Sequence, residues 1–322
     1  MNNPDSFPVD VSEQRDWINA EKAAKGLSWT QLGTLVGIPS GTLSPFAADQ
    51  YAGNVERVAR AIYKYRQTIT SQAARAQGLA RDPGYFETAT SRRLRGLLII
   101  AHMGRITVGA TGPGTGKTMT LREYCASTSN CWIGTMRHTD KSVNAMMAEV
   151  LRALGVPAKG TGWGRQMSHM VSSSVAGKRG LLVIDEANHL TWESLEEIRA
   201  WHDDTGVGVC LLGNEELLMR IQGGPRRDAF ARLNSRIAQS HIQNLPVEED
   251  VEAFCDAWEL ADPAVRSMLS RIALTPGAGG LRECRQIVEQ ASMLAADEDR
   301  PLAFADLRDA QAGRATKHIR TS

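Results

Sequence analysis

A glycine-rich stretch at residues 111–118, with the sequence TGPGTGKT, constrains the fold of this chain more than any other feature. The apolar run Ile106–Val108 before it reads as a strand, and Met119–Cys125 after it reads as the first turns of a helix. A glycine-rich turn between strand and helix lets successive backbone N–H groups surround phosphate oxygens, and the helix N-terminus adds favourable partial charge. The stretch therefore predicts a phosphate-binding loop.

The side chains at the end of this loop have separate expected roles. Lys117 is expected to reach the outer phosphates of a nucleotide, and the Thr118 hydroxyl to hold Mg²⁺. The usual pattern begins with glycine where this chain has Thr111, so the glycines that follow must supply the backbone freedom, because glycine alone takes positive φ cheaply. The expected nucleotide contacts of the loop are Gly112, Pro113, Gly114, Thr115, Gly116, Lys117 and Thr118.

Composition limits the kind of protein this can be. The length of 322 residues suggests about two domains. Lys and Arg number 37 against 36 for Asp and Glu, a net charge of +1, so any basic surface for nucleic acid must be local.

The five cysteines form no C-x-x-C pair and are expected to be reduced thiols. The N-terminus lacks the pattern of a signal peptide, and no apolar run approaches the ~18 residues of a membrane span, so we expect a cytoplasmic protein without membrane contact.

The pattern of apolar residues divides the chain into four predicted parts. Residues 1–72 look helical, residues 73–92 read as a basic linker, residues 93–245 alternate strands with helices, and residues 246–322 are helical again. Alternation of this kind predicts a mostly parallel sheet with helices on both faces. The expected strands are Leu97–Ile100, Ile106–Val108, Cys131–Gly134, Leu181–Ile184 and Val207–Leu212.

Polar side chains follow two of these strands. Leu181–Ile184 is a continuous apolar run, as expected of a strand buried on both faces, and it ends in Asp185 and Glu186. Asp185 at this position can hold the Mg²⁺ water shell beside Thr118, and Glu186 can polarise the water that attacks the γ-phosphate. Asn214, after the next strand, can reach between the metal and that water.

The order of these motifs resembles that of the AAA+ ATPases of DNA transposition, and most closely the target-DNA-capture proteins of the phage Mu B type. The resemblance rests on the loop, on DEANHL at 185–190, on Asn214, on FARLNSRI at 230–237 and on PGAGGLR at 276–282, and it covers nearly the whole chain. It implies an α/β fold: a P-loop AAA+ parallel sheet with flanking helices, an N-terminal helix-turn-helix domain and a C-terminal helical lid.

The resemblance also implies that ATP binds between subunits of a homo-oligomer. A neighbour's arginine would complete the site, with Arg236 as first choice and Arg232 as second. Arg282 matches the family's second sensor, and Arg285, one turn on, is the competing choice. ATP and Mg²⁺ are the expected cofactors.

Residues 27–44 fit a helix-turn-helix in which Gly37 makes the turn. The second helix would present Ser40, Thr42 and Ser44, hydroxyls that contact phosphate and base edges but discriminate poorly between sequences. The domain could therefore bind DNA weakly, contact a protein, or be a helical bundle without a DNA role.

Basic residues elsewhere are better electrostatic candidates for DNA. They give affinity without sequence preference and a strong salt dependence. In the segment 159–179, Trp163 could anchor its loop or contact DNA or a partner. The candidates are Arg92, Arg93 and Arg95, then Arg137, His138 and Lys141, and then Lys159, Arg165, Lys178 and Arg179.

These features lead to one expected function. The chain would bind ATP, oligomerise on target duplex DNA as a ring or helical filament without sequence preference, deliver it to a DDE-type transposase, and release it on hydrolysis, in the cytoplasm of a bacterial host. Two alternatives remain: a nucleotide-switched helix-turn-helix regulator that reads an operator, and an AAA+ motor that acts on protein complexes.

Overall fold

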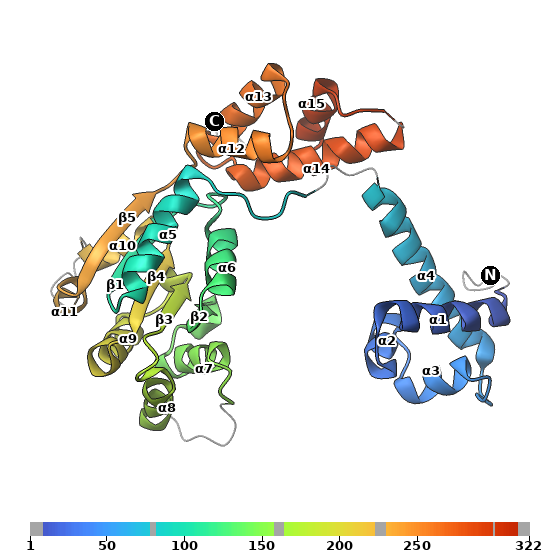
Figure 1. Ribbon diagram of the computed structural model, residues 1–322, viewed down its shortest axis with the longest axis horizontal. Helices are drawn as coiled ribbons and strands as arrows, with labels where there is room; N and C mark the ends of the chain where they lie inside the picture. Colours follow the sequence, from blue (N-terminus) through green and yellow to red (C-terminus); the bar gives the residue numbers. More distant parts are fainter. Residues whose placement is uncertain (1–8, 78–81, 158–163, 223–229, 299, 315–322) are drawn as a thin grey trace, which may run out of the picture. The chain divides into compact units, whose positions relative to one another are not determined.

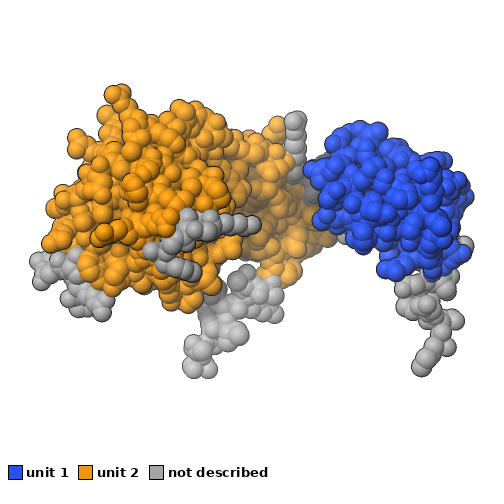
Figure 2. Space-filling model, turned by 90° about the horizontal axis from the view of Figure 1, so that it is seen from below, with its two compact units in different colours: residues 1–79, 295–301 blue, residues 80–294, 302–322 orange. Residues whose placement is uncertain are grey.

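The computed structural model describes residues 9–77, 82–157, 164–222, 230–298 and 300–314, with only the helical backbone for residues 72–77. The chain forms two compact units, residues 1–79 with 295–301 and residues 80–294 with 302–322, which Figure 2 shows in separate colours. The four-part division at residues 72, 92 and 245 stays a prediction. Within the described residues, no helix is long and apolar enough to cross a membrane.

The first unit is a bundle of helices with its own apolar core. Ser28 and Gln31 form a capping box that begins the second helix, and Gly37, with φ +76°, ends it. Two helices therefore lie at residues 29–36 and 40–47, within the stretch expected to form a helix-turn-helix, while that motif and a DNA-reading role for it stay predictions. The helices are α1 (Val11–Lys25), α2 (Trp29–Val36), α3 (Ser40–Ala47) and α4 (Val55–Gln77). Ile18, Leu32, Leu43, Phe46 and Ile62 are fully buried among them.

The second unit is built on a parallel sheet of five strands in the order β2-β3-β4-β1-β5. Every residue of β1, β3 and β4 is buried, which explains their continuous apolar sequences. The predicted parallel sheet is confirmed. The strands are β1 (Ile106–Thr111), β2 (Cys131–Thr135), β3 (Leu181–Asp185), β4 (Gly208–Gly213) and β5 (Ile237–Gln243).

Helices cover both faces of this sheet, as Figure 1 shows. Alternate residues of β3 enter different cores: Leu181 and Val183 pack with α5 and α6, whereas Leu182 and Ile184 pack with the helices of the other face. The flanking helices are α5 (Ala89–His102), α6 (Lys117–Ser127), α7 (Val143–Ala153), α8 (Arg165–Val175), α9 (Trp192–Thr205), α10 (Glu215–Gln222) and α11 (Ala231–Asn234).

The prediction of a strand at Leu97–Ile100 is wrong, because these residues belong to α5. Thr88 and Ser91 form a capping box that begins the helix. Its buried positions include Leu94, Leu97, Leu98 and Ala101, which follow the spacing of one helix face. The four consecutive apolar residues resemble a strand, although Ile99 is exposed and Ile100 is only partly buried in the helix.

The expectation of five reduced thiols is also wrong for two of them. Cys125 in α6 and Cys131 at the start of β2 form a disulfide, with 5.1 Å between their Cα atoms. The short connection from α6 to β2 brings the two together, although their spacing matches no familiar motif. The other three cysteines are buried free thiols, and burial raises the pKa of Cys210 and of Cys284 to about 12.

After the sheet, the chain forms a second group of helices with a core of its own. Fully or almost fully buried side chains such as Cys255, Leu269, Val288 and Leu307 fill this core. The predicted C-terminal helical region is present, and we call it the lid. Its helices are α12 (Glu248–Ala257), α13 (Pro263–Ala273), α14 (Leu281–Asp297) and α15 (Phe304–Gly313).

Candidate functional site

The glycine-rich loop joins β1 to α6 and has the geometry of a phosphate-binding loop. Gly114 and Gly116 have φ of +75° and +86°, a conformation that only glycine takes cheaply. A Cβ at Gly112 would lie 1.9 Å from the carbonyl oxygen of Asn244. Thr111, by contrast, is the last residue of β1 and pairs with Gln243 as extended strand, so this position requires no glycine. The departure from the usual pattern is thereby explained.

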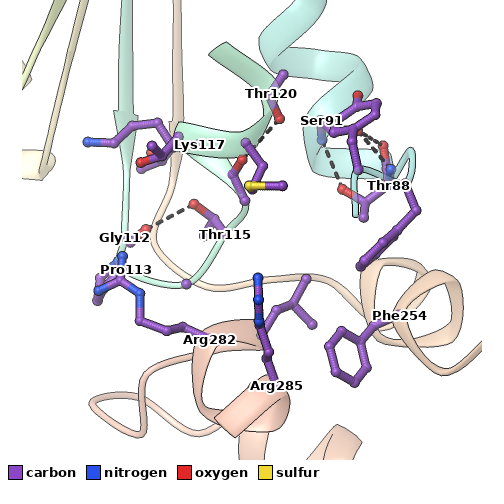
Figure 3. A pocket seen from close by; sticks show the side chains of 18 of the residues that line it. Thr88, Ser91, Gly112, Pro113, Thr115, Lys117, Thr120, Phe254, Arg282 and Arg285 are labelled. Atoms are coloured by element: carbon purple, nitrogen blue, oxygen red, sulfur yellow. Dashed lines mark hydrogen bonds between the residues drawn. The ribbon is translucent and has the colours of Figure 1, made fainter. Parts of the chain in front are cut away.

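Two threonine hydroxyls stabilise the loop through hydrogen bonds to its own backbone carbonyls. Thr115 donates from Oγ1 to the carbonyl of Gly112 at 2.9 Å, and Thr120 donates to the carbonyl of Gly116 at 3.1 Å (Figure 3). These bonds shape the turn around its backbone N–H groups. The loop is thus preorganised for an anion.

Lys117, the first residue of α6, contacts both Asp185, the last residue of β3, and Glu186, which follows it. Its Nζ is 3.0 Å from Asp185 Oδ1 and 2.8 Å from Glu186 Oε1. Burial opposes the charged amine, but the two carboxylates outweigh this effect and raise the pKa of Lys117. The lysine therefore carries its charge beside the loop at neutral pH.

Glu186 is held in an unusual backbone conformation. Its φ of 55° places it in the left-handed region, between β3 and the short helical turn η2 (Ala187–His189). A non-glycine residue in this region is strained, and such strain clusters at functional sites. The turn points the Glu186 side chain back to Lys117.

These elements surround a cavity of about 480 Å³. The loop, Glu186, Asn214 and Arg282 all line it, although they come from four separate elements or connections. The structure therefore brings together most of the nucleotide-site residues that the sequence predicted. Thr118 is exposed at the loop, and Asp185 is nearly buried beside it.

An aromatic wall at the other end of the cavity was missed in the sequence. Tyr85 and Phe86, in the segment 82–88 before α5, line the cavity together with Phe254 of α12 and Trp258, which directly follows that helix. Phe86 meets Phe254 edge-on with 6.1 Å between ring centroids, and Phe254 stacks on Trp258 at 5.6 Å. A flat apolar surface of this kind suits a nucleobase. No motif marks it, because its parts lie about 170 positions apart.

The two candidate arginine fingers do not line this cavity in their own chain. Arg236 donates from Nε to Asp203 at 2.6 Å, and from Nη1 to the carbonyl of Arg232 at 3.0 Å. The hydrogen bond from Arg236 lowers the pKa of Asp203. Arg232 itself is exposed at the surface.

The DNA-binding candidates occupy several places. Arg137, His138 and Lys141 are exposed after β2, at the same carboxyl edge of the sheet as the loop. His138 and Lys141 line a second cavity, of about 830 Å³, that shares Asn214 with the first.

Arg92 and Arg93 lie in the first turns of α5, and Arg93 donates to Gln243 at 3.1 Å. Arg165 is exposed at the start of α8, and Ser40, Thr42 and Ser44 are half-buried on α3. Lys159 and Trp163 lie outside the described residues.

Comparison with known proteins agrees with this geometry. Residues 107–221 match the AAA domain family, and residues 235–313 match the C-terminal region of the Mu B transposition protein family. The chain is 31% identical to the Mu-like prophage FluMu DNA transposition protein B of Haemophilus influenzae, over 80% of this chain and 88% of that protein. It is 31% identical to the ATP-dependent target DNA activator B of Escherichia phage Mu, over 89% of this chain and 90% of that protein.

A solved structure supports the fold. Cdc6p from Pyrobaculum aerophilum superposes with a TM-score of 0.52 at 18% identity, over 69% of this chain and 65% of that chain. At this identity the likeness concerns the fold alone.

Proposed function

Since the chain belongs to the Mu B family of transposition proteins and has an AAA ATPase core, we propose that it captures target DNA in an ATP-driven cycle. ATP binding assembles subunits on duplex DNA without sequence preference, and the assembly presents that DNA to a DDE-type transposase. Hydrolysis then releases the DNA.

The gathering of the loop, Glu186, Asn214 and Arg282 around one cavity carries this proposal. Lys117 binds the outer phosphates, and Glu186 polarises the attacking water. Asn214 orients that water, and Arg282 brings the lid to the phosphates. Asn214 also lines the second cavity, where His138 and Lys141 lie. It is therefore in a position to respond both to the nucleotide and to DNA bound by these basic residues.

The residues beside the loop fit a Mg²⁺ ion that accompanies the nucleotide. Thr118 offers a hydroxyl and Asp185 a carboxylate, the oxygen donors that Mg²⁺ prefers while it keeps several waters and phosphate oxygens. When bound, the ion would neutralise charge on the phosphates. Asp185 already accepts the backbone N–H of Glu186 at 3.0 Å, which fixes the carboxylate for this role.

In this proposal an arginine from the neighbouring subunit completes each site. Arg236 is the first choice, and it must exchange its intrachain partner Asp203 for the neighbour's γ-phosphate. Nucleotide binding and assembly then become one linked event, because the site is complete only between subunits.

Mixing two inactive variants tests the donation in trans. Arg236→Ala lacks the finger but keeps its own Glu186, whereas Glu186→Gln lacks the catalytic acid but still offers Arg236 to a neighbour. In a head-to-tail assembly of equal parts, roughly a quarter of the sites are complete, so we expect DNA-stimulated ATP hydrolysis to recover to about that fraction of wild type. The same mixture with Arg232→Ala in place of Arg236→Ala checks the second choice. Hydrolysis that stays at the sum of the two separate variants would exclude Arg236 as a trans finger.

The exposed basic residues after β2 are proposed to bind the DNA backbone. Each lost phosphate contact lowers the steepness of the dependence of log K on log[salt] by about 1, so Arg137→Ala with Lys141→Ala should reduce it by about 2. Fluorescence anisotropy with several duplexes at graded salt concentrations measures this dependence. The affinity for all duplex sequences should fall equally. Arg271→Ala with Arg308→Ala, on exposed positions of the lid, is the matched control. An unchanged slope would place the DNA elsewhere.

A further inference from the structure

The first turns of α14 contact both ends of the nucleotide cavity. At the phosphate end, the N–H of Leu281 donates to the carbonyl of Gly114 in the loop at 3.0 Å. The approach is so close that a Cβ at Gly114 would lie 1.9 Å from the carbonyl oxygen of Gly279. The start of α14 is thus fixed against the loop by backbone contact.

At the base end, Arg285 ties the same helix to the segment 82–88. Its Nη2 lies 2.8 Å from Asp82 Oδ2, and its Nε lies 2.7 Å from Glu289 Oε1 one turn further along α14. The other oxygen of Asp82 accepts the N–H of Gly84 at 3.1 Å, so the carboxylate is held in a tight turn. In Figure 3, Arg285 extends from α14 toward the cavity, with Arg282 and Phe254 on either side.

The two arginines of α14 differ in how their charge is compensated. Arg285 has two carboxylate partners, whereas Arg282 is exposed and, within the described part of the chain, has no ion pair. A phosphate would have to compete with two carboxylates for Arg285, but with none for Arg282. Arg282 is therefore the arginine free to follow the phosphates, and Arg285 has another task.

We propose that Asp82, Arg285 and Glu289 form a clasp that slows nucleotide exchange. Arg285 acts as a positioning residue: it holds the start of the segment 82–88, which forms the wall beside the base, against the lid. Among the described residues, the ion pair of Arg285 with Asp82 is the one that joins residues 82–85 to another element. Nucleotide leaves when this wall parts from α14, so the clasp sets the dissociation rate. The inference rests on the proposed function, since it takes the cavity to be the nucleotide site.

The size of the effect follows from the exposure of the clasp. The Arg285 and Asp82 side chains are 42% and 49% exposed, so their ion pair is worth at most about 1 kcal/mol, which corresponds to roughly a fivefold change in rate. The clasp therefore changes exchange kinetics without deciding whether nucleotide binds at all.

Release of a fluorescent ADP from the full chain, followed by stopped flow, tests the clasp. Arg285→Gln and Asp82→Asn should each release ADP about fivefold faster, and the double variant should release it no faster than either single variant, because both changes break the same ion pair. Arg308→Gln, an exposed lid arginine beside Asp309, is the matched control and should release ADP at the wild-type rate. Thermal unfolding without nucleotide checks that the variants are folded.

Three results would overturn the clasp. The single variants could release ADP at the wild-type rate, or the two effects could multiply in the double variant. Arg285→Gln could also abolish binding while Asp82→Asn has no effect, which would make Arg285 a direct phosphate ligand. If the wild-type chain bound no nucleotide, the proposed function itself would fail, and this outcome is distinct from the other three.

Discussion

Lys117→Ala is expected to lose ATP binding and ATP-dependent assembly on DNA together. The Lys117 amino group lies between Asp185 and Glu186 at 3.0 and 2.8 Å, so its removal leaves two carboxylates without their cation beside the phosphates. Loss of charge-assisted hydrogen bonds and the added repulsion should weaken ATP binding by at least about a hundredfold, or roughly 3 kcal/mol. Titration with a fluorescent ATP analogue measures binding, and co-sedimentation with duplex DNA measures assembly.

Lys178→Ala is the matched control for the measurement of ATP binding. Lys178 is exposed and lies 5.7 Å from the centre of the Trp132 ring, away from the nucleotide cavity. It should bind ATP as the wild type does. If Lys117→Ala still assembled on DNA in response to ATP, the loop would not be the nucleotide site.

Glu186→Gln is expected to separate binding from hydrolysis. Gln keeps the size of the side chain and an oxygen that can accept the Lys117 bond now made at 2.8 Å, so ATP should still bind. It cannot act as a base, so hydrolysis should fall by about 10² to 10⁴. Because release needs hydrolysis in this account, the variant should hold DNA longer after free ATP is removed. Phosphate release and DNA dissociation rates, measured on the same sample, check both effects.

A carboxylate outside the reaction path is the control for Glu186. Glu216 is exposed near the start of α10 and lines only the second cavity, so Glu216→Gln should hydrolyse ATP normally. If Glu186→Gln slowed hydrolysis but released DNA at the wild-type rate, hydrolysis and DNA release would not be linked.

The strands that could be predicted from sequence are those buried on both faces. β1, β3 and β4 consist wholly of buried residues, so each left an apolar run in the sequence. β5 was missed because it is the edge strand beside β1, and of its residues only Gln243 is buried. The LLII run at 97–100 reads as a strand although it lies in α5, because four residues are too few to separate strand from helix periodicity.

The phosphate end of the site could be predicted because its residues are set by local geometry. The loop lies between a strand and a helix, and parallel strands bring Asp185 and Glu186 to the same edge. The aromatic wall and the clasp could not, because they join residues near 82–88 to residues near 254 and 285. Such pairings depend on how the lid packs, which no local pattern encodes.

Assembly of the chain on DNA should depend on ATP binding. Electron microscopy of the wild-type protein with duplex DNA, with and without a non-hydrolysable ATP analogue, measures this dependence. We expect ordered oligomers along the DNA with the analogue and bare DNA without it. Equal coverage of the DNA in the two samples would show that assembly does not need ATP.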